Sequence, residues 1–83
     1  MRILVVEDDI DLNRQLKQAL EDAGYVVDTA SDGEEGHYLG DTEPYDCVVL
    51  DIGLPQMDGI SVLQRWREDD RSMPVLILTA RDR

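Results

Sequence analysis

Apolar residues along the chain gather into four short runs, separated by longer stretches in which apolar and polar positions mix. The runs Ile3–Val6 and Val48–Leu50 are rich in β-branched residues, show no alternation and lead into acidic groups. Runs of this kind are typical of strands buried on both faces of a parallel sheet. The pattern predicts four strands, over Arg2–Val6, Tyr25–Ala30, Tyr45–Asp51 and Pro74–Thr79. The second of these is the most polar, which suits an edge of the sheet.

Between the runs, apolar residues recur at helical spacing. Three helices are predicted, from Asp9 or Ile10 to about Ala23, from about Glu34 to Gly40, and from about Gly59 to Glu68. The first has one apolar stripe, made by Leu12, Leu16, Ala19, Leu20 and Ala23. Gly24 follows it, and a glycine just past the last turn commonly ends a helix in the left-handed conformation.

Strands and helices thus alternate along the whole chain. Helices long enough to cross back over a sheet predict parallel strands with right-handed connections, hence an α/β fold with a doubly wound parallel sheet. The strand order could be 2-1-3-4, which would put the reversal of order between the first and third strands. Ligands of open α/β sheets bind at the carboxyl ends of strands beside such a point. Residues 1–83 show no repeat, linker or low-complexity tract, so they make at most one small domain.

Acidic residues stand where two of the predicted strands end. Glu7 and Asp8 follow the first strand directly, and Asp51 ends the third. If these strands are neighbours, three carboxylates meet at one edge, and three like charges that close cannot all stay ionised unless a cation joins them. Asp8 or Asp9 alone would more simply cap the next helix. The matching strand ends instead favour a site for a divalent metal and a phosphoryl group, with Mg²⁺ as the best fit.

Calcium is the alternative cation. Asp9, Asp11 and Asn13 have the spacing that opens an EF-hand loop. Arg14 stands where that loop needs glycine, however, and Leu20 stands where it needs glutamate. The EF-hand interpretation is therefore rejected.

Asp51 can serve as a metal ligand only or also as a nucleophile. A carboxylate that attacks a phosphoryl donor forms an acyl phosphate, and such a transfer needs charge neutralisation and positioning more than acid–base chemistry. Thr79 ends the fourth predicted strand, beside the third, so its hydroxyl is expected to reach the same edge. There it could donate to a phosphoryl oxygen on Asp51, and the small Ala80 would leave the approach open.

Charge and cysteine content narrow the setting. The formal net charge is −11, so this segment is repelled by phosphate backbones and anionic membranes, and we expect it to bind neither. No apolar stretch approaches the length of a membrane span, and the start turns acidic too soon for a signal peptide. Cys47 is the single cysteine. It is expected as a buried apolar residue in a reducing cytoplasm.

Three stretches together resemble the receiver domain of bacterial two-component response regulators. They are Val5–Asp9, Val49–Gly59 and Leu78–Arg81, which read VVEDD, VLDIGLPQMDG and LTAR. Three such motifs in order and at suitable spacing are highly specific, and the resemblance covers the whole chain. It is most like the OmpR/PhoP-type subfamily, whose receivers precede a winged-helix DNA-binding domain. A flavodoxin-like receiver fold is implied.

The resemblance also implies roles for five residues. Asp51 would accept a phosphoryl group from the phosphohistidine of a histidine kinase, with no turnover of an external substrate. Asp8 would bind Mg²⁺ directly, with Glu7 acting through water and Gly53 through its backbone carbonyl. Thr79 would be the switch hydroxyl that moves toward the phosphoryl group. The module would then switch a transcription-regulating output domain that lies outside this chain.

The chain also departs from the family pattern, which continues past Arg83 with a helix, a strand that carries a lysine, and a last helix. Lys17, the only lysine, is expected mid-helix and is no counterpart of that residue. We therefore expect an incomplete receiver fold, with four strands, three helices and no DNA-binding domain. An uncovered strand edge and apolar face would invite a homodimer or a swapped copy.

Two other functions compete with the phosphoacceptor. A phosphatase of the haloacid dehalogenase type also uses a strand-end nucleophilic aspartate, but it wants a second aspartate where Gly53 stands. A protein-interaction module that is not phosphorylated would suit the missing lysine but not the intact acidic set. Of the remaining residues, His37 is expected at the surface, and Trp66 in the core or lining a groove.

Overall fold

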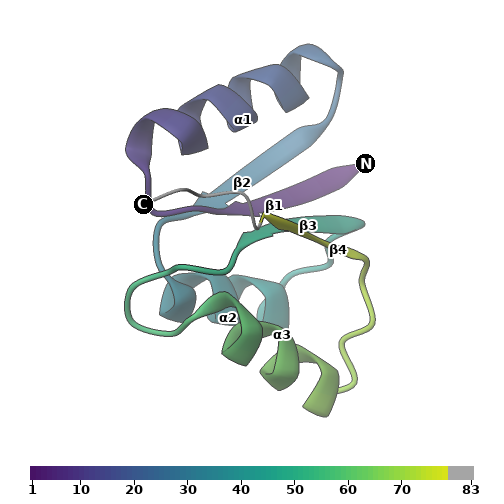
Figure 1. Cartoon of the computed structure of the whole chain (residues 1–83). Helices are drawn as coiled ribbons and strands as arrows, with labels where there is room; N and C mark the ends of the chain where they lie inside the picture. The colour runs from purple at the N-terminus through teal and green to yellow at the C-terminus, as the bar shows by residue number, and fades with distance from the viewer. Residues whose placement is uncertain (79–83) are drawn as a thin grey trace.

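The structure, a computed structural model, describes residues 1–78 (Figure 1). Its elements are β1 (Arg2–Val6), α1 (Ile10–Asp22), β2 (Val26–Ala30), α2 (Gly33–Thr42), β3 (Cys47–Asp51), α3 (Gly59–Glu68) and β4 (Val75–Leu78). The strands form one parallel sheet in the order β2-β1-β3-β4. α1 lies on one face of this sheet, and α2 and α3 lie on the other (Figure 1). The predicted α/β fold and strand order are confirmed.

Alternate residues of β1 point to opposite faces of the sheet and build two apolar layers. Ile3 and Val5 belong to the layer that packs against α1. Leu4 and Val6 belong to the layer beneath α2 and α3, together with the fully buried Trp66. Both faces of β1 are covered, which is why the strand reads as a continuous apolar run without alternation. The prediction that Trp66 lies in the core is confirmed.

α2 extends beyond the predicted Glu34–Gly40, and its glycines account for its position. A Cβ on Gly36 would lie 2.7 Å from Val6 Cγ1, and one on Gly40 would lie 2.4 Å from the ring of Trp66. Any side chain at either position would push α2 away from the sheet or from α3. The close packing that these glycines permit offsets their low helix propensity, roughly 1 kcal/mol per residue relative to alanine.

α1 is the longest of the described helices, and none of its residues is fully buried. Its apolar stripe packs Leu16 and Leu20 onto the sheet. On the exposed side, Gln18 Nε2 donates a hydrogen bond to Asp22 Oδ1 at 2.8 Å. Within residues 1–78, no helix combines the length and apolar character needed to cross a membrane.

Element boundaries differ from the predicted ones by one or two residues. β2 begins one residue late because the Tyr25 N–H donates to Leu20 O at 3.1 Å and so belongs to the end of α1. Gly24, with a φ of +97°, closes that helix as predicted. β3 begins two residues late, and its Cys47 is half-buried rather than buried. Thr79, predicted to end the fourth strand, lies outside the described residues.

Candidate functional site

β1 and β3 are neighbours, and their carboxyl ends bring three acidic residues together. Val6 pairs in register with Leu50, so Glu7 and Asp51 follow side by side. Carboxylate oxygens of Glu7, Asp8 and Asp51 all lie within 4.8 Å of one another. These are the carboxylates that sequence reasoning expected at one edge of the sheet, and we call them the acidic edge.

Burial distinguishes this group from an ordinary patch of surface acids. Glu7 is 0% exposed and Asp51 is 1% exposed, while Asp8 is half-buried. Removing a carboxylate from water is costly unless other groups compensate its charge. Like-charge repulsion also strengthens as the local dielectric constant falls. The acidic edge is therefore an arrangement that a cation would stabilise.

Hydrogen bonds fix the backbone where β1 leads into α1. Asp9 is the N-cap of α1, and its side chain accepts hydrogen bonds from two N–H groups of the first turn, at 3.0 and 3.1 Å. The Asp9 N–H itself donates to Glu7 Oε2 at 2.8 Å. Asn13 Nδ2 donates to Glu7 O at 2.9 Å. Asp9 therefore caps α1, and the carboxylate of Asp8 belongs to the acidic edge.

Two glycines hold the loop that follows β3. The Gly59 N–H donates to Ile52 O at 2.8 Å, and a Cβ on Gly59 would lie only 2.3 Å from Asp51 O. On the other side of the loop, the Gly33 N–H donates to Pro55 O at 3.1 Å. A side chain on Gly59 would displace the backbone of Asp51 itself. Gly59 is therefore a positioning residue for the acidic edge.

Sequence reasoning missed this role of Gly59. Asp58, the residue before it, is the N-cap of α3, and its side chain accepts a hydrogen bond from the Ser61 N–H. That bond is the largest cause that lowers the pKa of Asp58. The close approach of Gly59 to β3 leaves no signal in a single sequence beyond the glycine itself.

Gly53 differs from Gly59 in its surroundings. Its N–H donates to Asp51 Oδ1 at 3.3 Å, which orients that carboxyl group. A Cβ on Gly53 would meet no atom within 4 Å among the described residues. The space that a side chain would occupy at this position is open, and the role of the Gly53 carbonyl stays a prediction.

Thr79 and Lys17 are the two other residues that the sequence analysis considered for this site. Thr79 lies outside the described residues, so its switch role stays a prediction. Leu78, the residue before it, pairs in register with Asp51. Lys17 lies in the middle of α1, as predicted.

The donor set of the acidic edge consists of oxygen atoms. Hard dications such as Mg²⁺ are bound in this way, through one or two carboxylates, water and phosphoryl oxygens. Among residues 1–78, no histidine or cysteine belongs to this group of three carboxylates. Zinc and other borderline metals favour sites that contain such ligands. The residues present therefore fit Mg²⁺.

Comparison with known proteins assigns the chain to a family. Residues 3–83 match the response regulator receiver domain. The chain belongs to the response regulator receiver family. A receiver domain is a phosphoacceptor and has no turnover on an external substrate.

Among curated relatives, the transcriptional regulatory protein PhoP of Escherichia coli is 46% identical over 82 residues, which are 99% of this chain and 37% of PhoP. The chain thus spans little more than a third of the length of that relative. Among solved structures, TrrA of Thermotoga maritima in complex with Mg(2+)-BeF has a TM-score of 0.90 and 37% identity, over 98% of this chain and 70% of TrrA.

A second solved structure is the receiver domain of a sensor histidine kinase from Pseudomonas aeruginosa, with a magnesium ion coordinated in the active site cleft. It has a TM-score of 0.84 and 34% identity, over 95% of this chain and 66% of that one. The described strands and helices therefore cover only part of the receiver fold. The prediction of a PhoP-like, incomplete receiver is confirmed.

Proposed function

We propose that Asp51 is the phosphoacceptor of a response regulator and takes its phosphoryl group from the phosphohistidine of a histidine kinase. The observation that carries the proposal is the burial of Asp51 at the end of β3, within 4.8 Å of the carboxylates of Glu7 and Asp8. An aspartate with no role beyond solvation of the surface would be exposed, and it would not need two carboxylates beside it. Family membership supplies the class of donor.

Mg²⁺ is the proposed cofactor. TrrA was solved in complex with Mg(2+)-BeF, and the Pseudomonas receiver with a magnesium ion in its active site cleft. In this chain Asp8 and Asp51 would hold the ion directly, Glu7 through water and Gly53 through its backbone carbonyl. Bound Mg²⁺ would offset the negative charge of the carboxylates and of the phosphoryl oxygens.

The transfer forms one bond and breaks one. A carboxylate oxygen of Asp51 attacks the phosphorus and gives an acyl phosphate, while the phosphorus–nitrogen bond of the phosphohistidine breaks. The bonding electrons return to the imidazole nitrogen of the kinase. Gly53, through its N–H, orients the attacking carboxyl group, and Gly59 keeps the backbone of Asp51 in place. The chain's own contribution is therefore mainly positioning.

Thr79 is proposed as the switch hydroxyl that responds to the acyl phosphate. The pairing of Leu78 with Asp51 supports this proposal, because Leu78 directly precedes Thr79. The signal would pass to a transcription-regulating output domain outside residues 1–83. The 46% identity to PhoP, a transcriptional regulatory protein, supports that output, and membership of the receiver family supports a cytoplasmic location.

Intact mass after incubation with acetyl phosphate, with and without Mg²⁺, tests the proposal. We expect a single phosphoryl addition that requires Mg²⁺ and is absent in Asp51→Asn. Asp70→Asn is the matched control, since Asp70 is an exposed carboxylate in the connection after α3. An adduct that persists in Asp51→Asn would contradict the assignment.

A Mg²⁺ titration followed by thermal unfolding separates the metal site from the transfer. Mg²⁺ is expected to raise the Tm of the wild-type chain but not that of Asp51→Asn, since a ligand that binds only the folded state stabilises it. A chain that takes no phosphoryl group and whose Tm ignores Mg²⁺ would instead be an interaction module.

A further inference from the structure

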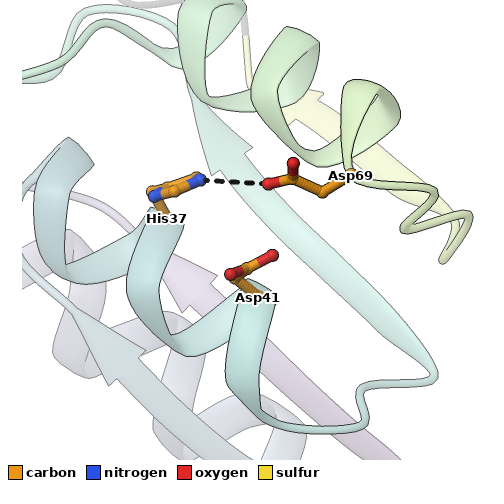
Figure 2. A group of neighbouring side chains, drawn as sticks. All are labelled: His37, Asp41 and Asp69. Carbon is orange, nitrogen blue, oxygen red and sulfur yellow. Dashed lines mark ion pairs between the residues drawn. The ribbon is translucent and has the colours of Figure 1, made fainter.

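A second group of metal-ligating side chains lies away from the acidic edge, where α2 and α3 pack together. His37 and Asp41 belong to α2, and Asp69 is the C-cap of α3 (Figure 2). One ligand atom from each residue lies within 4.8 Å of the other two. Figure 2 shows that His37 Nε2 is aimed at the carboxylate of Asp69, with Asp41 beside them. The distance from Nε2 to Asp69 Oδ2 is 3.9 Å.

Helix geometry and helix packing together hold these residues in place. His37 and Asp41 are four residues apart on α2, so their side chains share one face of that helix. The Trp66 Nε1–H donates to His37 O at 3.1 Å and ties α3 to the same turn of α2. Gly40 allows the ring of Trp66 to approach the helix backbone. The group is therefore built into a packed contact between two helices.

The imidazole of His37 carries the inference furthest. Sequence reasoning expected His37 at the surface, but its side chain is only 21% exposed, and Nε2 is completely covered. Among the described residues, Nε2 has no hydrogen-bond partner. Buried polar atoms are nearly always satisfied, and 3.9 Å to Asp69 is too long for a hydrogen bond. His37 Nε2 thus lies near two carboxylates and forms no hydrogen bond with either. This arrangement suits a bound atom between the three side chains.

The spacing suits a metal ion in that place. Ligand bonds of about 2.0–2.2 Å in tetrahedral geometry separate neighbouring ligand atoms by roughly 3.4 Å. The 3.9 Å between His37 Nε2 and Asp69 Oδ2 is only slightly wider, so a change of rotamer would close it. Asp69 is half-exposed and free to make that adjustment.

One cation already lies near this group. Arg71 Nε is 3.6 Å from Asp41 Oδ1, and its Nη2 donates to Asp41 O. Both side chains of this ion pair are more than a third exposed, so the pair contributes little to stability. A bound dication would displace the guanidinium from the carboxylate at small cost.

We propose that His37, Asp41 and Asp69 form a second metal site, specific for zinc or a similar borderline transition metal. One imidazole and two carboxylates are a ligand set that Zn²⁺ accepts, with water at the remaining position. Mg²⁺, which favours oxygen ligands, belongs at the acidic edge instead. An ion here links α2 to the end of α3, just before the connection to β4. The site therefore couples metal binding to the stability of the α2–α3 layer.

Isothermal titration with Zn²⁺ in the presence of excess Mg²⁺ tests this site, because the Mg²⁺ occupies the acidic edge. We expect one Zn²⁺ per chain. His37→Gln and Asp69→Asn are each expected to weaken binding by on the order of tenfold or more, since three protein ligands become two. Asp70→Asn removes the neighbouring exposed carboxylate and is expected to bind as the wild type does. Circular dichroism in a chelator checks that each variant is folded.

Asp51→Asn locates the ion. Zinc binding that survives Asp51→Asn and is weakened about tenfold or more in His37→Gln supports the second site, whether or not the chain accepts a phosphoryl group. Binding lost in Asp51→Asn but unchanged in His37→Gln would put the zinc at the acidic edge and overturn the proposal. No zinc binding by the wild-type chain would overturn it as well.

Discussion

The sheet treats its carboxylates in opposite ways at its two ends. Near the amino ends of β1 and β3, Asp28 Oδ2 accepts hydrogen bonds from Arg2 Nη2 at 2.7 Å and from Tyr45 Oη at 2.8 Å. Arg2 Nη2 also donates to Glu43 Oε1 at 3.1 Å, and its guanidinium lies 5.0 Å from the centroid of the Tyr45 ring. We call these four residues the paired cluster. At the carboxyl ends, the acidic edge instead brings three carboxylates within 4.8 Å of one another.

The comparison teaches what each end is built for. In the paired cluster, hydrogen bonds from within the chain hold the pKa of Asp28 below its usual value, the one from Tyr45 being the largest cause and the one from Arg2 the next. Such a cluster joins strands and needs nothing from solution. The acidic edge places like charges together in buried positions, which favours a cation and a phosphoryl group from outside. Of the two ends, only the acidic edge places buried carboxylates next to one another, and such a departure from stabilising pairing is typical of a functional site.

The largest expected effect comes from making the same substitution at both ends. Asp51→Asn is expected to abolish phosphoryl addition completely, while the folded state keeps its stability because one of three like charges is removed. Asp28→Asn is expected to keep phosphoryl addition and to lower the Tm, because Arg2 and Tyr45 lose a charged acceptor. Intact mass after incubation with acetyl phosphate and Mg²⁺ measures the phosphoryl addition, and thermal unfolding in Mg²⁺-free buffer measures the stability. A chain that Asp51→Asn destabilises more than Asp28→Asn does would break the comparison.

The second prediction concerns the loop beside the acidic edge. Gly59→Ala puts a methyl group 2.3 Å from Asp51 O, so the backbone must shift. We expect it to lower the free energy of unfolding by about 1–3 kcal/mol, as overpacking commonly does, and to slow phosphoryl addition. Urea denaturation and the time course of the mass shift measure these effects.

Gly53→Ala is the matched control in the same loop, since its methyl group enters open space. It is expected to change the free energy of unfolding by no more than about 0.5 kcal/mol. Equal losses in Gly53→Ala and Gly59→Ala would show that the loop needs flexible glycine in general, and would count against a specific positioning role for Gly59.

A smaller effect is expected from Tyr45→Phe in the paired cluster. It removes the hydrogen bond to Asp28 and is expected to lower the free energy of unfolding at neutral pH by about 1 kcal/mol, a low value for a bond to a charged group because Asp28 is partly exposed. Phosphoryl addition and its Mg²⁺ dependence are expected to stay unchanged.

The pH dependence of stability gives this variant a second readout. Because the pKa of Asp28 is lower in the folded state, its carboxylate stabilises the fold above the unfolded pKa, near 3.8, and this stability is lost as the pH falls through the folded value. Tyr45→Phe is expected to shrink that acid-induced loss. Urea denaturation between neutral and acidic pH measures it. An unchanged acid profile would mean that Arg2 alone sets the pKa of Asp28.

The acidic edge could be predicted from sequence because it depends on local order. Each acid directly follows an apolar run, and the topology of parallel strands brings such ends together without further information. Even there, the division of work between Asp8 and Asp9 stayed open, because both stand where a helix cap is expected. Only the hydrogen bonds of the first turn of α1 resolve it.

The paired cluster and the α2–α3 group could not be predicted in the same way. Arg2 lies 26 residues from Asp28 and 41 from Glu43, and no periodicity connects them. His37 meets Asp69 only because Gly40 lets Trp66 pack closely against α2. The predicted helix ended at about Gly40, whereas α2 continues to Thr42. Long-range packing reversed both conclusions, about the length of α2 and about the exposure of His37.

The smallest expected effect tests how the acidic edge divides its neighbouring residues. Asp9→Gly removes the side-chain cap of α1 but keeps the N–H that donates to Glu7, so it is expected to lower the free energy of unfolding by only about a few tenths of a kcal/mol. The rise of Tm with Mg²⁺ is expected to remain. Asp8→Asn is expected to do the reverse, with a nearly unchanged Tm in Mg²⁺-free buffer and a much weaker response to Mg²⁺. If both variants responded to Mg²⁺ alike, capping and metal binding would not be separate tasks, and the contrast between the acidic edge and the rest of the sheet would lose its sharpest boundary.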